Sequence, residues 1–215
     1  MKKLILLSFI FVLVGFLAIT CALSEGNQGE NQGNSLGNNE TGNQTQTKAG
    51  NLEQLHLMIQ NRNQEMEQER LNFNNQNKEK VFQNQNKVRE AVHAFLSMED
   101  LVGVIGPRVS VIAREFNNSV NKTAKAEERI YKKSGFAKFF TGGEEVAVEE
   151  LEEELDENQN RIQELQQLMG NCECSEELRN LFQEQIQNME QEQTRLRELA
   201  QKEKRNKGMF GWLWK

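Results

Sequence analysis

The residue best placed for chemistry is Cys21, which directly follows the first apolar stretch of the chain. Two lysines open the sequence, and an apolar run of about 16 residues follows at 4–19, shorter than the roughly 20 that a membrane-spanning helix needs. In a bacterium, a cysteine at this position receives a diacylglyceryl group on its sulfur, and the chain is cleaved before it. We therefore predict a lipoprotein signal peptide at 1–20 and a lipid on Cys21, although Thr20 is larger than usual there. The alternative is an ordinary secretory signal peptide followed by a chance cysteine.

The other two cysteines, Cys172 and Cys174, form one close pair in the segment GNCEC. Two cysteines separated by one residue can close only a small ring, so an intrachain disulfide is open to them but strained. A bond to another molecule is the alternative in an exported protein, and no nearby histidine completes a metal site. The CxxC spacing of redox enzymes is missing.

No set of residues predicts catalysis. The only histidines, His56 and His93, lie 37 positions apart without metal-ligating partners in the sequence. Neither a Ser/His/Asp set nor a phosphate-binding glycine loop is recognisable. We expect no catalytic residue, no metal, no cofactor and no enzymatic activity.

Aromatic residues gather at two places that could contact a partner. Phe136, Phe139 and Phe140 fall within SGFAKFFTGG, where the glycines indicate a turn. One interpretation is that these rings plug the end of a helical bundle, and the other is that they form an exposed contact patch. Trp212 and Trp214 lie in the last four residues beside basic residues, which suits a lipid interface, a docking contact or packing on the helical body.

Composition and charge predict long polar-faced helices. The chain has one proline, and removal of residues 1–20 leaves 24 basic and 32 acidic residues, a net charge of −8. Such a charge argues against nucleic acid as a partner. Residues 21–50 carry the lipidated cysteine and a Gly/Asn-rich segment that cannot bury enough apolar surface to fold, so we predict a flexible tether.

The segment 51–143 is predicted to be a helical body. Residues 52–101 contain apolar positions at helical spacing, and we expect one long helix or two nearly collinear ones, tightly packed only from Val81 onward. The run LVGVIGP ends this helix, and Pro107 opens the next one at its first turn. A buried strand in LVGVIGPRVSVIA is the alternative, although no second strand is available to pair with it.

Residues 144–207 are predicted to form an antiparallel coiled-coil hairpin, followed by a Trp-rich tail at 208–215. Steps of three and four residues define seams at Val148, Leu151, Leu155, Asn158, Ile162, Leu165 and Met169, and at Leu178, Phe182, Gln185, Met189, Glu192, Leu196 and Leu199. Acidic residues dominate 144–157 and basic residues dominate 195–207, so folding back places them side by side. The seams can be satisfied within one chain or between copies, which leaves a homo-oligomer open.

The chain combines the signal, the tether and the low-proline body with the sequence segments VREAVHAFLSMED…FNNSV…GFAKFF. In these features it resembles the plasmid-encoded outer-surface lipoproteins of Borrelia spirochaetes. The resemblance implies an antigen that is lipid-anchored in the outer membrane, exposed at the cell surface, and able to bind a host protein for adhesion or for evasion of immunity and complement. The alternative is a periplasm-facing structural or assembly lipoprotein whose hairpin contacts an envelope partner.

Overall fold

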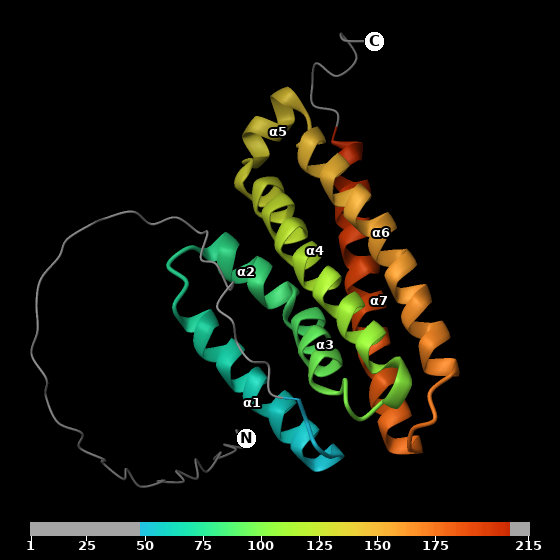
Figure 1. Ribbon diagram of the computed structural model, residues 1–215. Helices are drawn as coiled ribbons and strands as arrows, with labels where there is room; N and C mark the ends of the chain where they lie inside the picture. The colour runs from blue at the N-terminus through green and yellow to red at the C-terminus, as the bar shows by residue number, and fades with distance from the viewer. Residues whose placement is uncertain (1–47, 207–215) are drawn as a thin grey trace, which may run out of the picture. The chain divides into compact units, whose positions relative to one another are not determined.

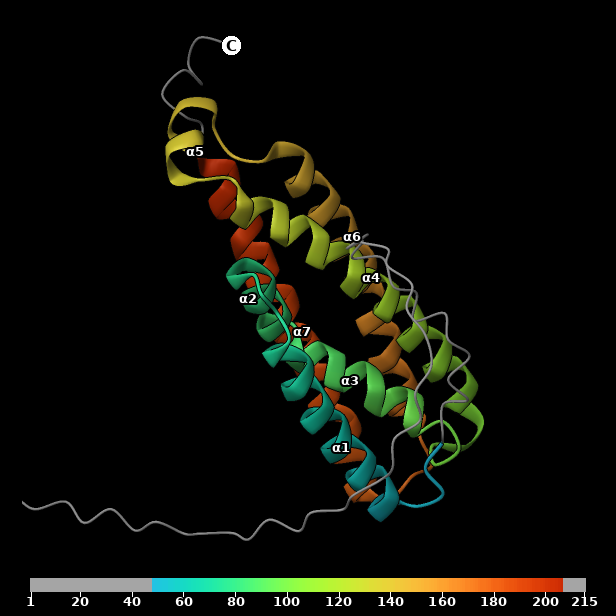
Figure 2. The same ribbon diagram turned by 90° about the vertical axis from the view of Figure 1, so that its left-hand side faces the viewer.

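The computed structural model describes residues 48–206. This part of the chain is all-α and contains no strand, which confirms the predicted fold class (Figure 1). Its helices are α1 (Leu52–Leu71), α2 (Gln76–Asn84), α3 (Asn86–Ser97), the short 3-10 helix η1 (Gly103–Ile105), α4 (Gly106–Lys132), α5 (Gly135–Thr141), α6 (Glu145–Gly170) and α7 (Glu176–Arg205). The long helices α1, α4, α6 and α7 lie roughly along one axis, so the described unit is elongated (Figures 1 and 2).

The first half of this unit is folded back on itself, and the expectation of one long helix or two collinear ones is wrong. α1 ends at Leu71, and α3 returns alongside it (Figure 1). The reversal occurs at an asparagine-rich turn, where the Asn75 side chain accepts hydrogen bonds from the backbone N–H groups of Asn77 (2.9 Å) and Lys78 (3.2 Å). Asparagine competes with helical hydrogen bonding in this way, so a turn forms without glycine or proline.

Tight packing begins in α1, which corrects the expectation that it begins only at Val81. Leu55 is fully buried, Ile59 is 9% exposed, and both belong to the main apolar core. Met66 is also buried, at 2% exposure. Leu55 and Ile59 are covered because α3 lies against α1, a neighbour that the spacing within α1 does not reveal.

The loop between α3 and α4 is helical rather than extended, so the buried-strand alternative is wrong. η1 occupies its centre, and Pro107 lies in the first turn of α4, as predicted. Gly106 is required for packing, because a Cβ atom there would lie 1.8 Å from the backbone oxygen of Glu99. The backbone can pass this close to the carbonyl oxygen of Glu99 only at a residue that has no side chain.

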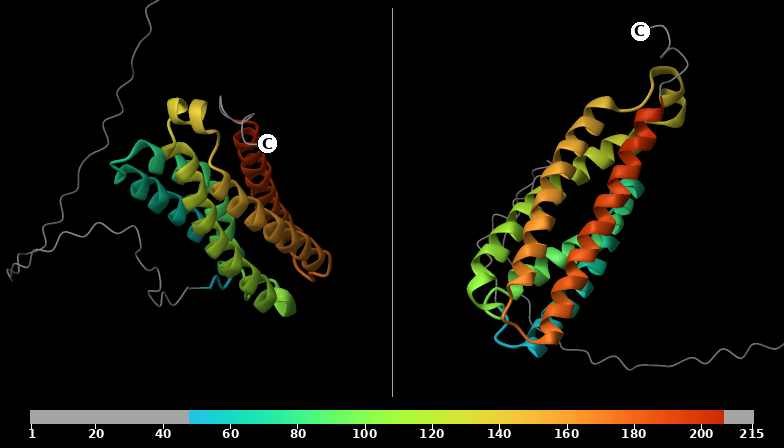
Figure 3. Two further views of the ribbon diagram at one scale, coloured as in Figure 1. Left: turned by 90° about the horizontal axis from the view of Figure 1, so that it is seen from above. Right: turned by 90° about the vertical axis from the view of Figure 1, so that its right-hand side faces the viewer.

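α6 and α7 form the predicted antiparallel hairpin and lie side by side along their length (Figure 3). The predicted seams are buried except at their last positions, Met169 and Leu199, which are partly buried. The polar seam residue Asn158 is 2% exposed and donates from Nδ2 to Oγ of Ser119 on α4 at 2.7 Å. The hairpin seam is therefore satisfied within the chain, against α4 as well as between its own arms.

The acidic residues at 144–157 and the basic residues at 195–207 form ion pairs at two places, as expected. Lys204 pairs with Glu152 at 2.6 Å, and Arg197 lies 4.0 Å from Asp156. Other acids of α6 pair instead with bases of α4, in the pairs Lys122–Glu154 and Arg129–Glu150. The acidic face of α6 thus helps to hold the hairpin on α4 as well as to orient α7.

The helical body and the hairpin share one core. The main apolar cluster takes side chains from α1, α3, α4, α6 and α7, and a second cluster joins α4, α6 and α7. The described residues fall within a single compact unit at 44–215. The hairpin is consequently an integral part of the bundle.

The two ends of the unit differ in what they carry. The chain enters at one end, where Lys48 pairs with Glu99 (2.9 Å) and Asp100 (3.1 Å) and the N–H of Ala49 donates to Ser97 O (2.9 Å). The start of α1 borders Glu177 in the first turn of α7, so the tip of the hairpin lies at this same end. α5 lies at the opposite end (Figures 1 and 2).

Candidate functional site

Several predicted features lie outside the described residues. These are the signal peptide at 1–20, Cys21, the tether up to residue 47, and the tail with Trp212 and Trp214. No helix within 48–206 is both long and apolar enough to cross a membrane. The lipid anchor and the tail therefore stay predictions.

Cys172 and Cys174 lie in the loop between α6 and α7, and a disulfide joins them within the chain. Their Cα atoms are 5.3 Å apart. Cys172 is 3% exposed, and its carbonyl oxygen accepts a hydrogen bond from Nη2 of Arg179 at 2.8 Å. The pair thus closes the hairpin tip at the end where the chain enters, which leaves neither sulfur free for another molecule.

The aromatic segment that follows α4 forms the short helix α5. Ser134 begins it, because its Oγ accepts a hydrogen bond from the backbone N–H of Ala137 at 3.1 Å. Gly142 ends it with a φ of 81°, a left-handed conformation that glycine adopts without steric cost. Both ends are thus encoded locally, and α5 is a distinct element between the long helices α4 and α6.

Polar contacts tie α5 and its linker to the end of α7. The Glu203 carboxylate, which is 3% exposed, accepts from Lys138 Nζ (2.8 Å) and from the N–H of Glu144 (3.0 Å). The N–H of Gly143 donates to the carbonyl oxygen of Asn206 at 2.6 Å, and Lys133 Nζ donates to Gly143 O at 2.7 Å. α5 is therefore held in place by hydrogen bonds and ion pairs, without burying a side chain of its own.

Two of the three phenylalanines of α5 are exposed and none is buried, so the interpretation that they plug the bundle is wrong. Phe136 is 76% exposed, Phe139 is 55% exposed, and no residue of α5 is buried. Phe140 is half-buried, and its ring centroid lies 4.8 Å from that of Phe136 and 5.1 Å from that of Phe139, both edge to face. The three rings form one cluster, which we call the α5 aromatic patch. Its exposure favours the contact-patch interpretation.

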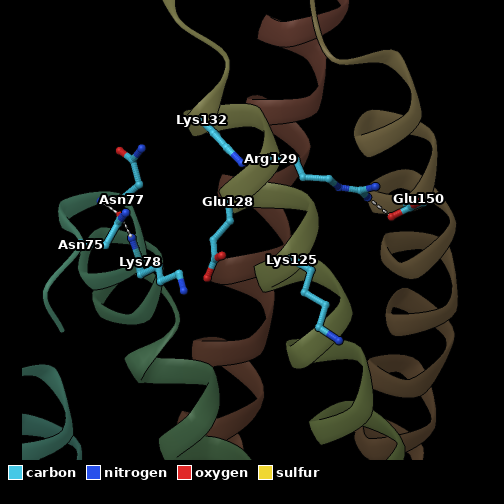
Figure 4. Close-up of a pocket in the computed structure, with 8 residues that line it drawn as sticks. All are labelled: Asn75, Asn77, Lys78, Lys125, Glu128, Arg129, Lys132 and Glu150. Atoms are coloured by element: carbon cyan, nitrogen blue, oxygen red, sulfur yellow. Dashed lines mark hydrogen bonds and ion pairs between the residues drawn. The ribbon is translucent and has the colours of Figure 1, made fainter. Parts of the chain in front are cut away.

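A second candidate, a groove of about 520 Å³, is formed by α2, α4 and α6 (Figure 4). Its lining residues are Asn75, Asn77, Lys78, Lys125, Glu128, Arg129, Lys132 and Glu150. Arg129 extends toward α6 and pairs with Glu150, whereas Lys78 reaches from α2 toward Glu128 (Figure 4). The lining holds four basic and two acidic side chains, and the basic ends do not gather around one point (Figure 4). The groove is thus a mixed-charge surface without a converging set of ligand groups.

The histidines stand apart from each other. His56 lies on the outer surface of α1, and His93 lies on α3, largely covered. Burial lowers the pKa of His93, and the positive charge of Arg62 lowers it further. Within 48–206 no three His, Cys, Asp or Glu residues are grouped so that they could hold a metal ion.

Sequence reasoning missed a buried charge network between α2, α4 and α7. Glu127 of α4 is fully buried and is bound by two nitrogens of Arg195, while Asn84 donates to it from α2 at 2.8 Å. The charge pattern of the hairpin predicts instead that Arg195 faces the acids of α6. The available signal was Glu127 itself, a charged residue at a position that continues the apolar stripe of α4.

Comparisons with family models, with curated proteins and with solved structures found no match to this chain. The resemblance to Borrelia lipoproteins is therefore carried only by the residues that suggested it. The α5 aromatic patch likewise rests on the geometry of this chain alone.

Proposed function

We propose that this is a lipid-anchored bacterial surface protein that binds a host protein through the α5 aromatic patch. Supporting sequence features are the signal at 1–20, Cys21 as the lipid attachment point and the tether predicted at 21–50. The last residues of that segment are packed and not flexible, because Ala49 is 1% exposed and its N–H donates to Ser97 O. The observation that carries the proposal is the exposure of Phe136 and Phe139 at the end of the unit farthest from where the tether enters. The role would be adhesion or evasion of immunity, with the displayed helices acting as a surface antigen.

The position of the patch suits presentation away from a membrane. The tether enters beside Glu177 in the first turn of α7, whereas α5 is bound to Glu203 near its last turn. Twenty-six residues of helix at 1.5 Å each separate these points by about 40 Å. A lipid at Cys21 would hold the near end of the unit and leave the patch as the remote end.

The chemistry of the patch fits a protein partner. Clustered aromatic rings supply large apolar contact area with few rotatable bonds, and phenylalanine is among the residues enriched at protein interfaces. The hairpin tip, an alternative binding surface, is less suited, because it lies at the tethered end and its cysteines are joined to each other. The α5 patch is therefore the surface that we assign to the partner.

Surface display is tested by adding a protease to intact cells and following this protein beside a periplasmic marker. We expect the protein to be degraded while the marker survives. Protection of both would contradict surface display and favour the periplasm-facing structural role.

Partner binding is tested by capturing host serum and matrix proteins with residues 21–215 carrying Cys21→Ser. We expect a captured protein to be lost with the double substitution Phe136→Ser/Phe139→Ser. The matched control is Val104→Ser, which removes another exposed apolar side chain (97% exposed) in the loop at the opposite end. Equal capture by all three proteins would refute the patch as the contact surface.

A further inference from the structure

The described part of the chain stops beside the α5 aromatic patch. Asn206, its last residue, accepts a hydrogen bond from Gly143, just after the end of α5, and Glu203 one turn earlier is bound to Lys138 of α5. Whatever follows residue 206 therefore starts within reach of the aromatic rings. We propose that the C-terminal segment 207–215 packs its apolar side chains on the α5 aromatic patch of the same molecule.

The segment has the composition and the length for this packing. Its sequence is KGMFGWLWK, in which the apolar residues are Met209, Phe210, Trp212, Leu213 and Trp214. Nine extended residues span at most about 30 Å, whereas the seven residues of α5 span about 10 Å. The tail can thus reach every ring of α5, with chain to spare for the two glycines to turn.

Burial of apolar area supplies the driving force. Phe136 and Phe139 are mostly exposed among the described residues, which leaves apolar area in water at a cost in free energy. Two tryptophans left in water would carry a comparable cost. Aromatic rings also attract one another edge to face, the arrangement already present between Phe140 and its neighbours. Because the tail is covalently held beside the patch, the two meet at an effective concentration near the millimolar range.

The charges around α5 permit the contact. The basic residue of α5, Lys138, is already paired with the buried Glu203, which reduces its repulsion of Lys207 and Lys215. Glu145 and Glu149 on the first turns of α6 are exposed, and neither forms an ion pair within 48–206. These two acids can face the lysines that flank the apolar tail.

The tail can be observed directly, because Trp212 and Trp214 are the only tryptophans of the chain. Their fluorescence is measured in residues 21–215 carrying Cys21→Ser, with an isolated 207–215 peptide as the reference for full exposure. We expect emission at shorter wavelength than the peptide and slower quenching by acrylamide. Phe136→Ser/Phe139→Ser should move both readouts to the peptide values.

Controls separate this packing from unfolding. Both phenylalanines are exposed, so the far-ultraviolet circular dichroism of the double variant should match that of the unsubstituted chain. Val104→Ser, in the loop at the other end, should leave emission and quenching unchanged. If the double variant loses helicity, the single variant Phe136→Ser replaces it. This change removes the most exposed ring of α5 and should still shift the emission toward the peptide value.

Each remaining outcome counts against the proposal. Peptide-like emission in the unsubstituted chain would show that the tail does not pack. Emission that shifts on dilution would show that the tail packs on a second copy. Emission that is peptide-like until phosphatidylcholine–phosphatidylglycerol vesicles are added would assign the tail to a lipid surface. The readouts need no host protein, so failure of this inference would leave the proposed function untouched. If the tail does pack, a host protein must displace it to reach Phe136 and Phe139.

Discussion

Arg195 on α7 binds Glu127 on α4 at two points, with Nη1 2.6 Å from Oε1 and Nη2 2.8 Å from Oε2. Glu127 is fully buried, and Arg195 also pairs with Glu192, which is 6% exposed. One guanidinium thus neutralises two covered carboxylates. A planar guanidinium can form two parallel hydrogen bonds with one carboxylate. This contact therefore fixes how α7 lies against α4.

The first prediction concerns removal of this guanidinium. Arg195→Met leaves Glu127 and Glu192 covered without a counter-charge, and we expect a loss of about 3 kcal/mol in the free energy of unfolding. Arg197→Met is the matched control on the same helix, because its pair with Asp156 is exposed and should change stability by about 0.5 kcal/mol or less. Urea unfolding measures both, and equal effects would contradict a special role for Arg195.

The second prediction concerns pH and Glu192. Burial raises the pKa of Glu192 above its ordinary 4.5, although Arg195 opposes the shift and Glu127 and Arg89 also act on it. The folded state therefore holds this proton more tightly than the unfolded state, and stability falls as pH rises from 4.5 through the raised value. Glu192→Gln should flatten that fall in unfolding measured across the range. An unchanged pH profile would refute the assignment.

The third prediction concerns the end where the chain enters. The hydrogen bond from Lys48 lowers the pKa of Glu99 below its ordinary 4.5. The stability that this carboxylate contributes is present above pH 4.5 and is lost as pH falls through the lowered value. We expect the amide of Ala49, bonded to Ser97 O, to lose protection from hydrogen exchange over that range. In Glu99→Gln its protection should stay constant with pH.

The fourth prediction concerns Gly106. Gly106→Ala places a Cβ atom 1.8 Å from the carbonyl oxygen of Glu99, and a backbone atom cannot move aside as a flexible side chain can. We expect a loss of about 2 kcal/mol or more in thermal unfolding. Gly170→Ala at the end of α6 is the control, because a Cβ atom added there meets nothing within 4 Å and alanine favours helix. A neutral Gly106→Ala would contradict the close approach.

The parts of the fold that could be predicted are those set by residues close together in the sequence. Pro107 at the start of α4 and the seams of α6 and α7 were readable, because a helix start and a heptad repeat are recorded in neighbouring residues. The turn at 72–75 was also local, but its asparagine signal is weaker than glycine or proline and was missed.

The candidate site could be predicted only in part. The sequence located Phe136, Phe139 and Phe140 and left two interpretations open, because composition does not tell whether a ring is covered. Exposure was decided by Lys138 and Glu203, which lie 65 residues apart and hold α5 by polar contacts rather than by its rings.

The sequence by itself determined the all-α class, the start of α4 and the antiparallel hairpin of α6 and α7. It also supplied the expected anchor at Cys21, which lies outside the described residues. Tertiary structure alone decided that α1 returns beside α3, that Arg195 reaches Glu127 instead of the acids of α6, and that the aromatic patch lies opposite the tethered end. The physical reason is that periodicity reports which face of a helix is apolar, whereas the neighbour that covers this face depends on the packing of every other helix.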